Sequence, residues 1–392
     1  MKRARAALAL ALAALPVRLV LALATDLSPD EAYYLCAARR PEAIPPMPDH
    51  PPLLPWMLRA TDGLAAWPVE LRVRIWPLLT ATALGFICIE LARRRGAGPR
   101  GQVSAAWIGS WALLPMAGGF VATPDGPALL AIGALLLWSA ADRDRSMSRW
   151  GDFGAGLAAL VGTAAKVVVA PVAALLSLPS SRPWLARVGV AGAAVLTLPL
   201  LLPSLRFQAH HALAAGSPPS WSLADAVGSA ATAVVAQLAL WSPWVLWLGG
   251  AALRGDAAPR GHRLLVAVFS LLVLTSAIVR GLPPEPNWWA PAALVVVVAA
   301  ARPAEQLAPR LRMTMLATVV VPTWVVASHV LHPWLPLPTS ADPTARLHGW
   351  KQGPEPLDAP GIGPYGPPAE RCIYREDCTE INSIFDMMKP MM

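Results

Sequence analysis

Long apolar runs separated by short polar segments recur along the whole chain, which is the pattern of a protein that crosses a membrane many times. A helical span needs about 20 predominantly apolar residues, and the runs approach that length. Because backbone polar groups in lipid must be satisfied within their own segment, we predict that the runs are helices. The eleven predicted spans cover residues 6–25, 73–92, 102–120, 127–141, 151–164, 167–180, 186–203, 225–250, 263–279, 288–301 and 312–330.

Basic residues gather in alternate polar segments, which the positive-inside rule assigns to the cytoplasmic side. These six segments and the residues that flank them hold 18 Lys or Arg against 6 acids, so the net charge of +8 reflects topology and gives no reason to expect a nucleic-acid partner. The six segments are Lys2 to Arg5, Arg93 to Arg100, Arg143 to Arg149, Arg182 to Arg187, Arg254 to Arg263 and Arg302 to Arg312. We predict a cytoplasmic N-terminus, a transmembrane domain over 1–330 and a short extracytoplasmic C-terminal tail over 331–392.

Composition agrees with an all-α polytopic membrane protein, since hydrophobic residues make up 55% of 392 positions and charged residues only 14%. The segment 151–180 lies between two basic loops, so it must cross an even number of times. We predict a helical hairpin with its turn near Thr163 to Lys166. The first apolar run can also be read as a signal peptide, but Pro16 and Arg18 interrupt it and favour a span.

The first predicted outer loop, residues 26–72, carries seven carboxylates and is the best candidate for chemistry. Asp30 and Glu31 emerge from the membrane surface directly after the first span, where a carboxylate can act as a general base. The alternative is structural, because Pro29 followed by two acids is also typical of the start of a helix.

Other outer segments carry further candidates, each with a structural alternative. His50 lies in the sequence Asp49-His-Pro-Pro, where it either handles a phosphate, metal or proton or is a solvated turn. Asp125 lies in a tight turn that would otherwise be a helix cap. Lys166 is costly in an apolar span and should face a cavity or an anion unless it snorkels. Arg206 and Arg280 suit an anionic ligand or an interfacial belt.

Taken in order, these motifs resemble the protein O-mannosyltransferase-like glycosyltransferases of family 39, which are related to the lipid A aminoarabinose transferases and have the C-type glycosyltransferase fold. The resemblance covers roughly residues 15–300, with a further match at the start of the tail. Its motifs are Arg18, Asp30-Glu-Ala-Tyr-Tyr34, Asp49-His-Pro-Pro-Leu53, Thr123-Pro-Asp125, Lys166, Phe207-Gln208, Pro286-Asn-Trp288, Asp342-Pro-Thr344 and Leu347-His-Gly-Trp350.

The resemblance implies transfer of a sugar from a polyprenyl-phosphate donor at the extracytoplasmic face, in a bacterial inner membrane, with Asp30 as base and Glu31 beside it. The donor's phosphate and sugar would then be bound by residues among Arg18, Tyr34, His50, Asp125, Lys166, Arg206, Arg280 and Asn287. The sugar and the acceptor, whether lipid, glycan or protein, stay open. His50 departs from the lysine found in some relatives, Gly126 follows Asp125, and the tail is short.

No Cys or His spacing indicates a zinc site, and a divalent cation is the one cofactor that the sequence leaves open. Cys372 and Cys378 are close enough in the predicted outer tail for a disulfide. A transporter or flippase of lipid-linked intermediates is the alternative function, but no internal repeat supports it. A noncatalytic scaffold would leave the clustered outer acids unexplained.

Overall fold

The computed structural model describes residues 2–43, 49–140, 149–177, 184–214, 222–255, 258–339, 342–351 and 366–388, and these residues form helices and no strand. Of the predicted basic residues, Arg143, Arg145 and Arg182 lie outside these ranges. The first half contains α1 (Lys2–Ala24), α2 (Pro29–Arg39), α3 (Leu53–Asp62), α4 (Val69–Arg94), α5 (Pro99–Trp111), α6 (Leu113–Ala117), α7 (Asp125–Ser139), α8 (Arg149–Ala165), α9 (Val169–Ser177), α10 (Trp184–Leu196) and α11 (Leu198–Ala214). The second half contains α12 (Leu223–Trp241), α13 (Pro243–Arg254), α14 (Arg260–Arg280), the 3-10 helix η1 (Pro286–Trp289), α15 (Ala290–Gln306), α16 (Pro309–Leu331), η3 (Ala345–Leu347), α17 (Gly366–Arg375) and α18 (Thr379–Met388).

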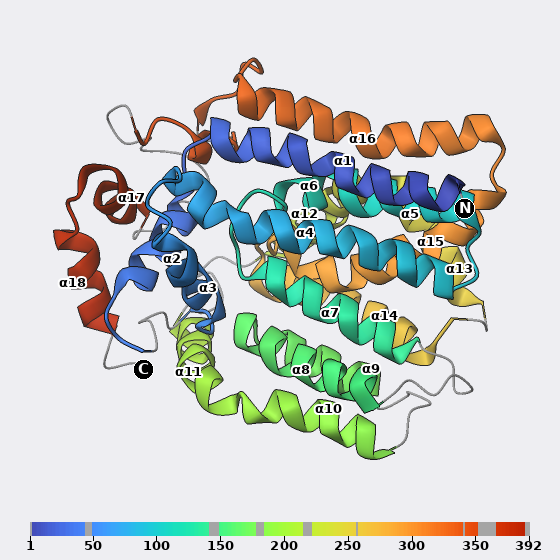
Figure 1. Ribbon diagram of the computed structural model, residues 1–392, viewed down its shortest axis with the longest axis horizontal. Coiled ribbons are helices and arrows are strands. Elements are labelled where there is room, and N and C mark those ends of the chain that lie inside the picture. The colour runs from blue at the N-terminus through green and yellow to red at the C-terminus, as the bar shows by residue number, and fades with distance from the viewer. Residues whose placement is uncertain are drawn as a thin grey trace.

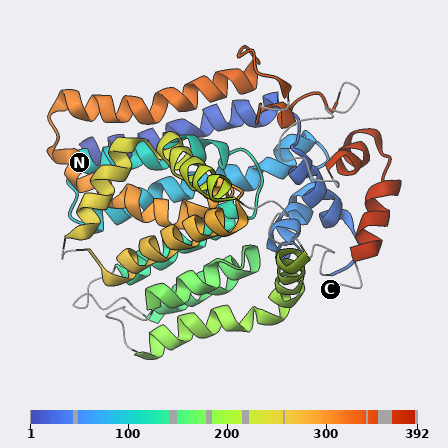
Figure 2. The ribbon, with the colours of Figure 1, turned by 180° about the vertical axis from the view of Figure 1, so that it is seen from behind.

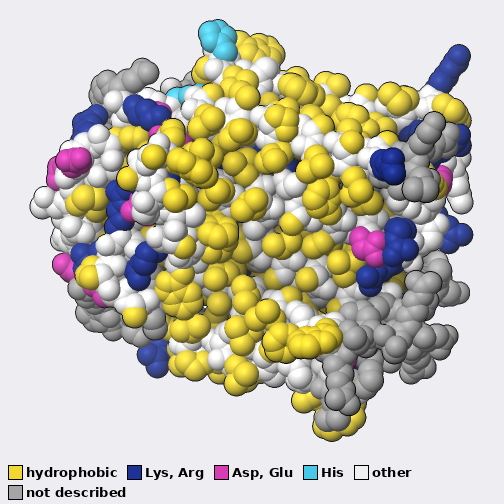
Figure 3. Space-filling model, in the orientation of Figure 1, with side chains coloured by type: hydrophobic (Ala, Val, Ile, Leu, Met, Phe, Trp, Pro, Cys, Tyr) yellow, Lys and Arg dark blue, Asp and Glu magenta, His cyan; other side chains and the backbone are white. Residues whose placement is uncertain are grey.

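The long helices run side by side between two ends of the molecule, one carrying the N-terminus and the other carrying α2, α3, α17 and α18 (Figure 1). The view from behind shows the same arrangement, with α17 and α18 far from the N-terminus (Figure 2). Hydrophobic side chains cover a broad band of the surface between charged groups at either end (Figure 3). This is the surface expected of a protein that spans a bilayer.

Every predicted span falls on one or more helices. Because some predicted spans contain two helices, the number of helices does not give the number of spans. Five helices of the described residues are long and apolar enough to cross a membrane, or six when the pair bent by 48° at residues 186–206 counts as one span. The chain is therefore a multi-pass membrane protein, and the count of eleven spans stays a prediction. The hairpin at 151–180 is present as α8 and α9, which turn at Lys166.

Besides the bent pair at residues 186–206, the predicted spans 102–120 and 225–250 are each broken into two helices, and proline is the physical reason in both of these. Pro115 and Pro243 lack the N–H that a continuous helix needs at those positions. Ala112 separates α5 from α6 in an extended conformation, and Ser242 separates α12 from α13 at φ +73°. The Ser242 hydroxyl lies 2.7 Å from Thr318 Oγ1 of α16, which satisfies a polar group at the break.

Contacts between helix ends hold the predicted cytoplasmic segments together. Arg95 contacts His262 at 2.6 Å, and the Gly98 N–H donates to Glu305 at 2.6 Å. Arg94 donates to the Leu137 carbonyl at 3.0 Å. The ends of α4, α7, α14 and α15 therefore meet on the side of the molecule away from α2, as the charge pattern predicts.

Candidate active site

Asp30 lies in the first turn of α2, which begins for a clear local reason. Ser28 is the N-cap, its hydroxyl accepts from the Glu31 N–H at 3.3 Å, and its own N–H donates to Glu31 Oε2 at 2.8 Å. Pro29 occupies the first helical position, where its missing N–H costs nothing. This capping box turns the Asp30 carboxylate toward a cavity and leaves its side chain 27% exposed.

Glu31 lies in a different environment from its neighbour, because it is fully buried in an ion pair with Arg74 of α4. Its two oxygens accept from Arg74 at 3.0 and 2.8 Å, and Oε1 also accepts from the Ala122 N–H at 2.8 Å. Arg74 donates in addition to the carbonyls of Ala22 and Thr25. A catalytic role for Glu31 stays a prediction, and this geometry favours a structural role because both of its oxygens accept from protein donors.

Asp125 is the second carboxylate of the site and joins two other predicted residues. It begins α7, and its Oδ1 accepts from Lys166 Nζ at 2.7 Å while its Oδ2 accepts from Asn287 Nδ2 at 3.0 Å. Lys166 comes from the turn between α8 and α9, and Asn287 comes from η1. The lysine faces an anion as predicted, and that anion belongs to the protein.

A cavity of about 680 Å³ is lined by Asp30, Asp125 and Asn287 together. Most of its polar lining comes from helix starts and from the segment after α16, on the side where α2 lies. These polar residues are Ser28, Asp30, Thr123, Asp125, Glu285, Asn287, Thr344 and Arg346. The rest of the lining is mainly apolar and comes from the interiors of α4, α5, α6, α15 and α16. The cavity is therefore amphipathic, with carboxylates at its polar part.

Arg346 is the functional candidate that the sequence did not indicate. It belongs to η3, lines the cavity and forms an ion pair through Nη2 with Asp30 Oδ2. The motifs Asp342-Pro-Thr344 and Leu347-His-Gly-Trp350 flank it, so the resemblance pointed to this segment without selecting the arginine. The C-terminal tail is thus part of the site.

Six of the predicted donor-binding residues are not among those that line the cavity, and Lys166, which contacts Asp125, is one of them. Arg18 is buried and donates to the carbonyls of Ser110 at 2.7 Å and Pro115 at 3.3 Å, next to the break between α5 and α6. There it satisfies backbone acceptors that the broken helix leaves open, which explains an arginine within a span.

The other four also have different surroundings. Tyr34 is buried in α2, with its ring 6.1 Å from that of His50. Arg206 is exposed on α11, and Arg280 lies over the Trp288 ring at 5.9 Å at the end of α14. The side chains of Gln208, His210 and His211 lie outside the described residues.

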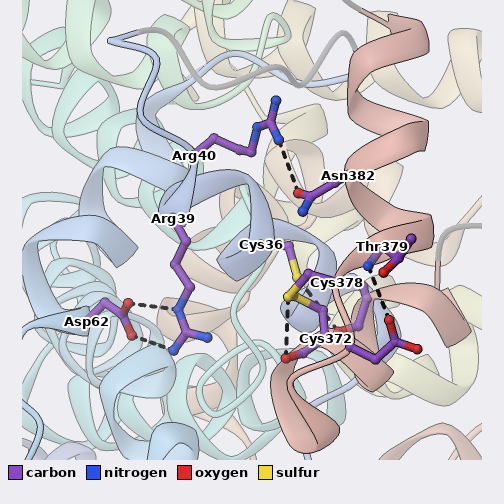
Figure 4. The surroundings of a disulfide bond; sticks show 10 residues. Cys36, Arg39, Arg40, Asp62, Cys372, Cys378, Thr379 and Asn382 are labelled. Carbon is purple, nitrogen blue, oxygen red and sulfur yellow. Dashed lines mark hydrogen bonds and ion pairs between the residues drawn. A yellow bond between two sulfur atoms is a disulfide. The ribbon is translucent and has the colours of Figure 1, made fainter.

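The C-terminal helices α17 and α18 form a cap on α2, joined to each other by a disulfide between Cys372 and Cys378 (Figure 4). Cys36 donates to the Ala369 carbonyl at 3.7 Å. Arg40 binds Asn382 at 3.1 Å and Asp386 at 2.8 Å. The predicted disulfide is therefore present, and it supports the helix that carries Asp30.

Replacing Cys372 and Cys378 together with serine should loosen this cap. Closing such a small loop typically contributes about 2 kcal/mol, so amide hydrogen exchange in α17 and α18 should speed up about thirtyfold. The measurement is hydrogen–deuterium exchange of the purified protein, with added reductant on the serine variant as the control. Equal exchange in the oxidised protein and the variant would show that the cap does not depend on the disulfide.

Glu370 of α17 is a buried carboxyl of a different kind, because neither of its oxygens has a hydrogen-bond partner among the described residues. Burial is the largest cause that raises the pKa of Glu370 well above its ordinary value, and the nearby carboxylates of Glu31 and Asp26 raise it further. Arg74 partly offsets this, whereas Glu70 adds to it. Glu370 is thus held protonated in the folded protein above the pH at which a free glutamate ionises.

Glu370→Gln should therefore stabilise the protein, and more so as the pH rises. Between the ordinary and the raised pKa the unfolded state binds fewer protons than the folded state, so the stability of the wild type falls with increasing pH. The neutral amide removes this dependence. Thermal unfolding in detergent at pH 5 and pH 8 should show a variant advantage at pH 8 that shrinks at pH 5. Glu376→Gln, an exposed change nearby, should show no such trend, and a parallel pH profile for both variants would contradict the assignment.

No group of three or more His, Cys, Asp or Glu side chains within the described part of the chain is arranged to hold a metal ion.

Residues 49–207 match the model of the family described as dolichyl-phosphate-mannose-protein mannosyltransferase. That segment includes His50, Asp125 and Lys166. No curated protein matches the sequence.

Among solved structures, the fold is similar to that of ArnT from Cupriavidus metallidurans in the apo state, with a TM-score of 0.61 and 18% identity over 82% of this chain. The chain spans 63% of the length of that protein. The Archaeoglobus fulgidus oligosaccharyltransferase in complex with Zn and sulfate gives a TM-score of 0.48 and 13% identity, over 81% of this chain and 52% of the other. The family match and the shared fold confirm that this chain resembles the protein O-mannosyltransferase-like membrane glycosyltransferases of the C-type fold.

Proposed function

We propose that the protein is a membrane glycosyltransferase that transfers a sugar from a polyprenyl-phosphate donor to an acceptor hydroxyl at the extracytoplasmic face. The observation that carries the proposal is the amphipathic cavity, whose polar part holds Asp30 and whose remainder is apolar. A polyprenyl-phosphate sugar has the same two parts, a polar head and a hydrocarbon chain. The matching family is also named for a donor of this class.

The reaction needs a base next to the acceptor. Asp30 accepts the proton of the acceptor hydroxyl as its oxygen attacks the anomeric carbon of the sugar. The bond between that carbon and the phosphate oxygen breaks, and polyprenyl phosphate leaves with the electron pair. A single displacement of this kind inverts the anomeric centre.

Asp125 and Asn287 supply hydrogen bonds for the sugar or the acceptor on the same wall of the cavity. Lys166 fixes the orientation of Asp125 by the 2.7 Å contact. Asn287 Oδ1 is buried and has no partner in the described part of the chain, so it is available to a sugar hydroxyl. These contacts would hold the reacting atoms in place.

The charge distribution and the disulfide support the proposed orientation of the protein in the membrane, with α2 on the extracytoplasmic side. The basic helix ends lie away from α2, which by the positive-inside rule supports an extracytoplasmic position for α2, the cavity's polar part and the C-terminal cap. A disulfide between Cys372 and Cys378 suits an oxidising compartment such as the bacterial periplasm. The bacterial inner membrane is the location consistent with both.

The test is to incubate the purified protein with a panel of polyprenyl-phosphate sugars and candidate acceptors and to measure the release of polyprenyl phosphate. Release that depends on one donor, together with a glycosylated acceptor of inverted configuration, is the expected result. Movement of a lipid-linked sugar across vesicles without release would overturn the proposal in favour of a flippase. An inactive outcome with every donor would also count against it.

A further inference from the structure

The geometry points to Arg346 as the residue that binds the phosphate of the lipid donor, and to an exchange in which Arg346 leaves Asp30 for that phosphate. This inference rests on the proposed function and adds to it a ligand for the phosphate and an order of events. Arg346 was not among the residues selected from the sequence.

The charges of the cavity favour this assignment. Its lining carries three carboxylates, from Asp30, Asp125 and Glu285, and Arg346 is the only Lys, Arg or His among the described lining residues. Lys166 already contacts Asp125. A phosphate entering an otherwise anionic space needs a cation, and arginine is well suited because its planar fork binds phosphate with two parallel hydrogen bonds.

Arg346 also has hydrogen-bond donors that are available to a ligand. One guanidinium nitrogen, Nη2, contacts Asp30. Another, Nε, is buried without a hydrogen-bond partner in the part of the chain that the structure describes. A guanidinium carries five N–H donors, and a buried donor without a partner is costly. A bound phosphate would satisfy it.

The segment that carries Arg346 is fixed to the same backbone that carries Asp30. The Asp26 N–H donates to the Leu347 carbonyl at 3.0 Å, and the Trp350 N–H donates to Asp26 Oδ2 at 3.0 Å. The Trp350 indole donates to the Arg346 carbonyl at 3.0 Å, and Leu347 is buried. The arginine is therefore held in place by packing, so a change of partner needs only side-chain movement.

Further support comes from the residues before η3. Asp342 accepts from the N–H and the hydroxyl of Thr344, each at 2.8 Å, and contacts His329 of α16 at 3.0 Å. Burial opposes the charge on Asp342, but these hydrogen bonds hold the pKa of Asp342 below its usual range. Asp342 thus anchors the segment to the end of α16.

The pairing has a consequence for the order of binding. In the free protein the guanidinium occupies Asp30 Oδ2, so that oxygen is not available to an acceptor hydroxyl. When the donor's phosphate takes the guanidinium, Asp30 is released and can accept a proton. The base is then available only after the donor is bound.

The experiment measures binding of a polyprenyl monophosphate and of the matching polyprenol, which lacks the phosphate, to the full-length protein in detergent. Arg346→Gln should weaken binding of the phosphate about ten- to hundredfold and leave binding of the alcohol unchanged. Arg346→Lys keeps the charge, so its affinity for the phosphate should lie between that of the wild type and that of Arg346→Gln. Arg39→Gln removes a cation of α2 that does not line the cavity, and this variant should bind both lipids like the wild type. Equal binding of the phosphate by wild type and both Arg346 variants would overturn the inference.

A double-mutant cycle tests the exchange itself. Asp30→Asn removes the competitor for Arg346, so it should tighten phosphate binding severalfold, and this gain should largely disappear in the Arg346→Gln background. A purely structural ion pair predicts weaker binding in both single variants and no such coupling, which would overturn the exchange. If the wild type transfers sugar but the Arg346 variants bind the phosphate as tightly as the wild type, the inference is refuted and the proposed function stands. Absence of any binding of the phosphate by the wild type would refute the proposed function as well.

Discussion

Replacing Asp30 with asparagine should reduce sugar transfer by about 100- to 10,000-fold while the protein stays folded. Asparagine keeps the shape of the side chain but cannot accept the proton of the acceptor hydroxyl. The side chain is 27% exposed and pairs with an Arg346 that is 24% exposed, so losing the charge costs little stability. The measurement is the rate of polyprenyl phosphate release under saturating donor, alongside thermal unfolding.

Asp62→Asn is the matched control for this result. Asp62 lies in the same predicted outer loop and is also paired, with Arg39 at 2.8 Å and Arg72 at 2.9 Å, but it does not line the cavity. Transfer should proceed at nearly the wild-type rate in this variant. A fully active Asp30→Asn protein would exclude Asp30 as the base.

Replacing Glu31 with glutamine should have the opposite profile, with a large loss of stability. The change leaves the fully buried Arg74 without its charge partner, and removing one member of a buried ion pair typically costs about 3 to 5 kcal/mol. It also weakens the hydrogen bonds from Ser28 and Ala122, which fix the start of α2. Thermal unfolding and the yield of folded protein measure the effect.

The double variant Glu31→Leu with Arg74→Met separates charge from packing. It removes both buried charges, so it should recover part of the stability that Glu31→Gln loses. Any folded Glu31→Gln protein should keep more activity than Asp30→Asn, because the base is intact. A stable Glu31→Gln protein without activity would instead restore a catalytic role for Glu31.

The resemblance favoured Asp30 as the base, but the residue types alone do not distinguish the two adjacent acids. Asp30 and Glu31 differ by one position, and both fit a catalytic loop as well as the start of a helix. One residue along a helix turns the side chain by about 100°, so one carboxylate faces the cavity and the other faces α4. Only the positions of Arg74 and Arg346 decide which acid is structural.

The sequence by itself determined that the chain is a helical multi-pass membrane protein, and it supplied a predicted orientation and the set of motifs. Apolar runs of near-spanning length and alternating basic segments are properties of the local sequence, so they can be identified without a structure. The helical turn at Lys166 and the close spacing of Cys372 and Cys378 were visible in this way, and the motifs singled out Asp30 and Asp125 as candidates.

The tertiary structure decided which charges meet. Arg18 and Arg74 are single positions within or next to spans, and their partners, the carbonyls around the break after α5 and the Glu31 carboxylate, lie 43 to 97 residues away. Arg346 meets Asp30 across 316 residues. Sequence spacing carries no information about such contacts, because they depend on how helices pack. The same arginine can bind a ligand, a carboxylate or a backbone carbonyl, and only the packed structure distinguishes these roles.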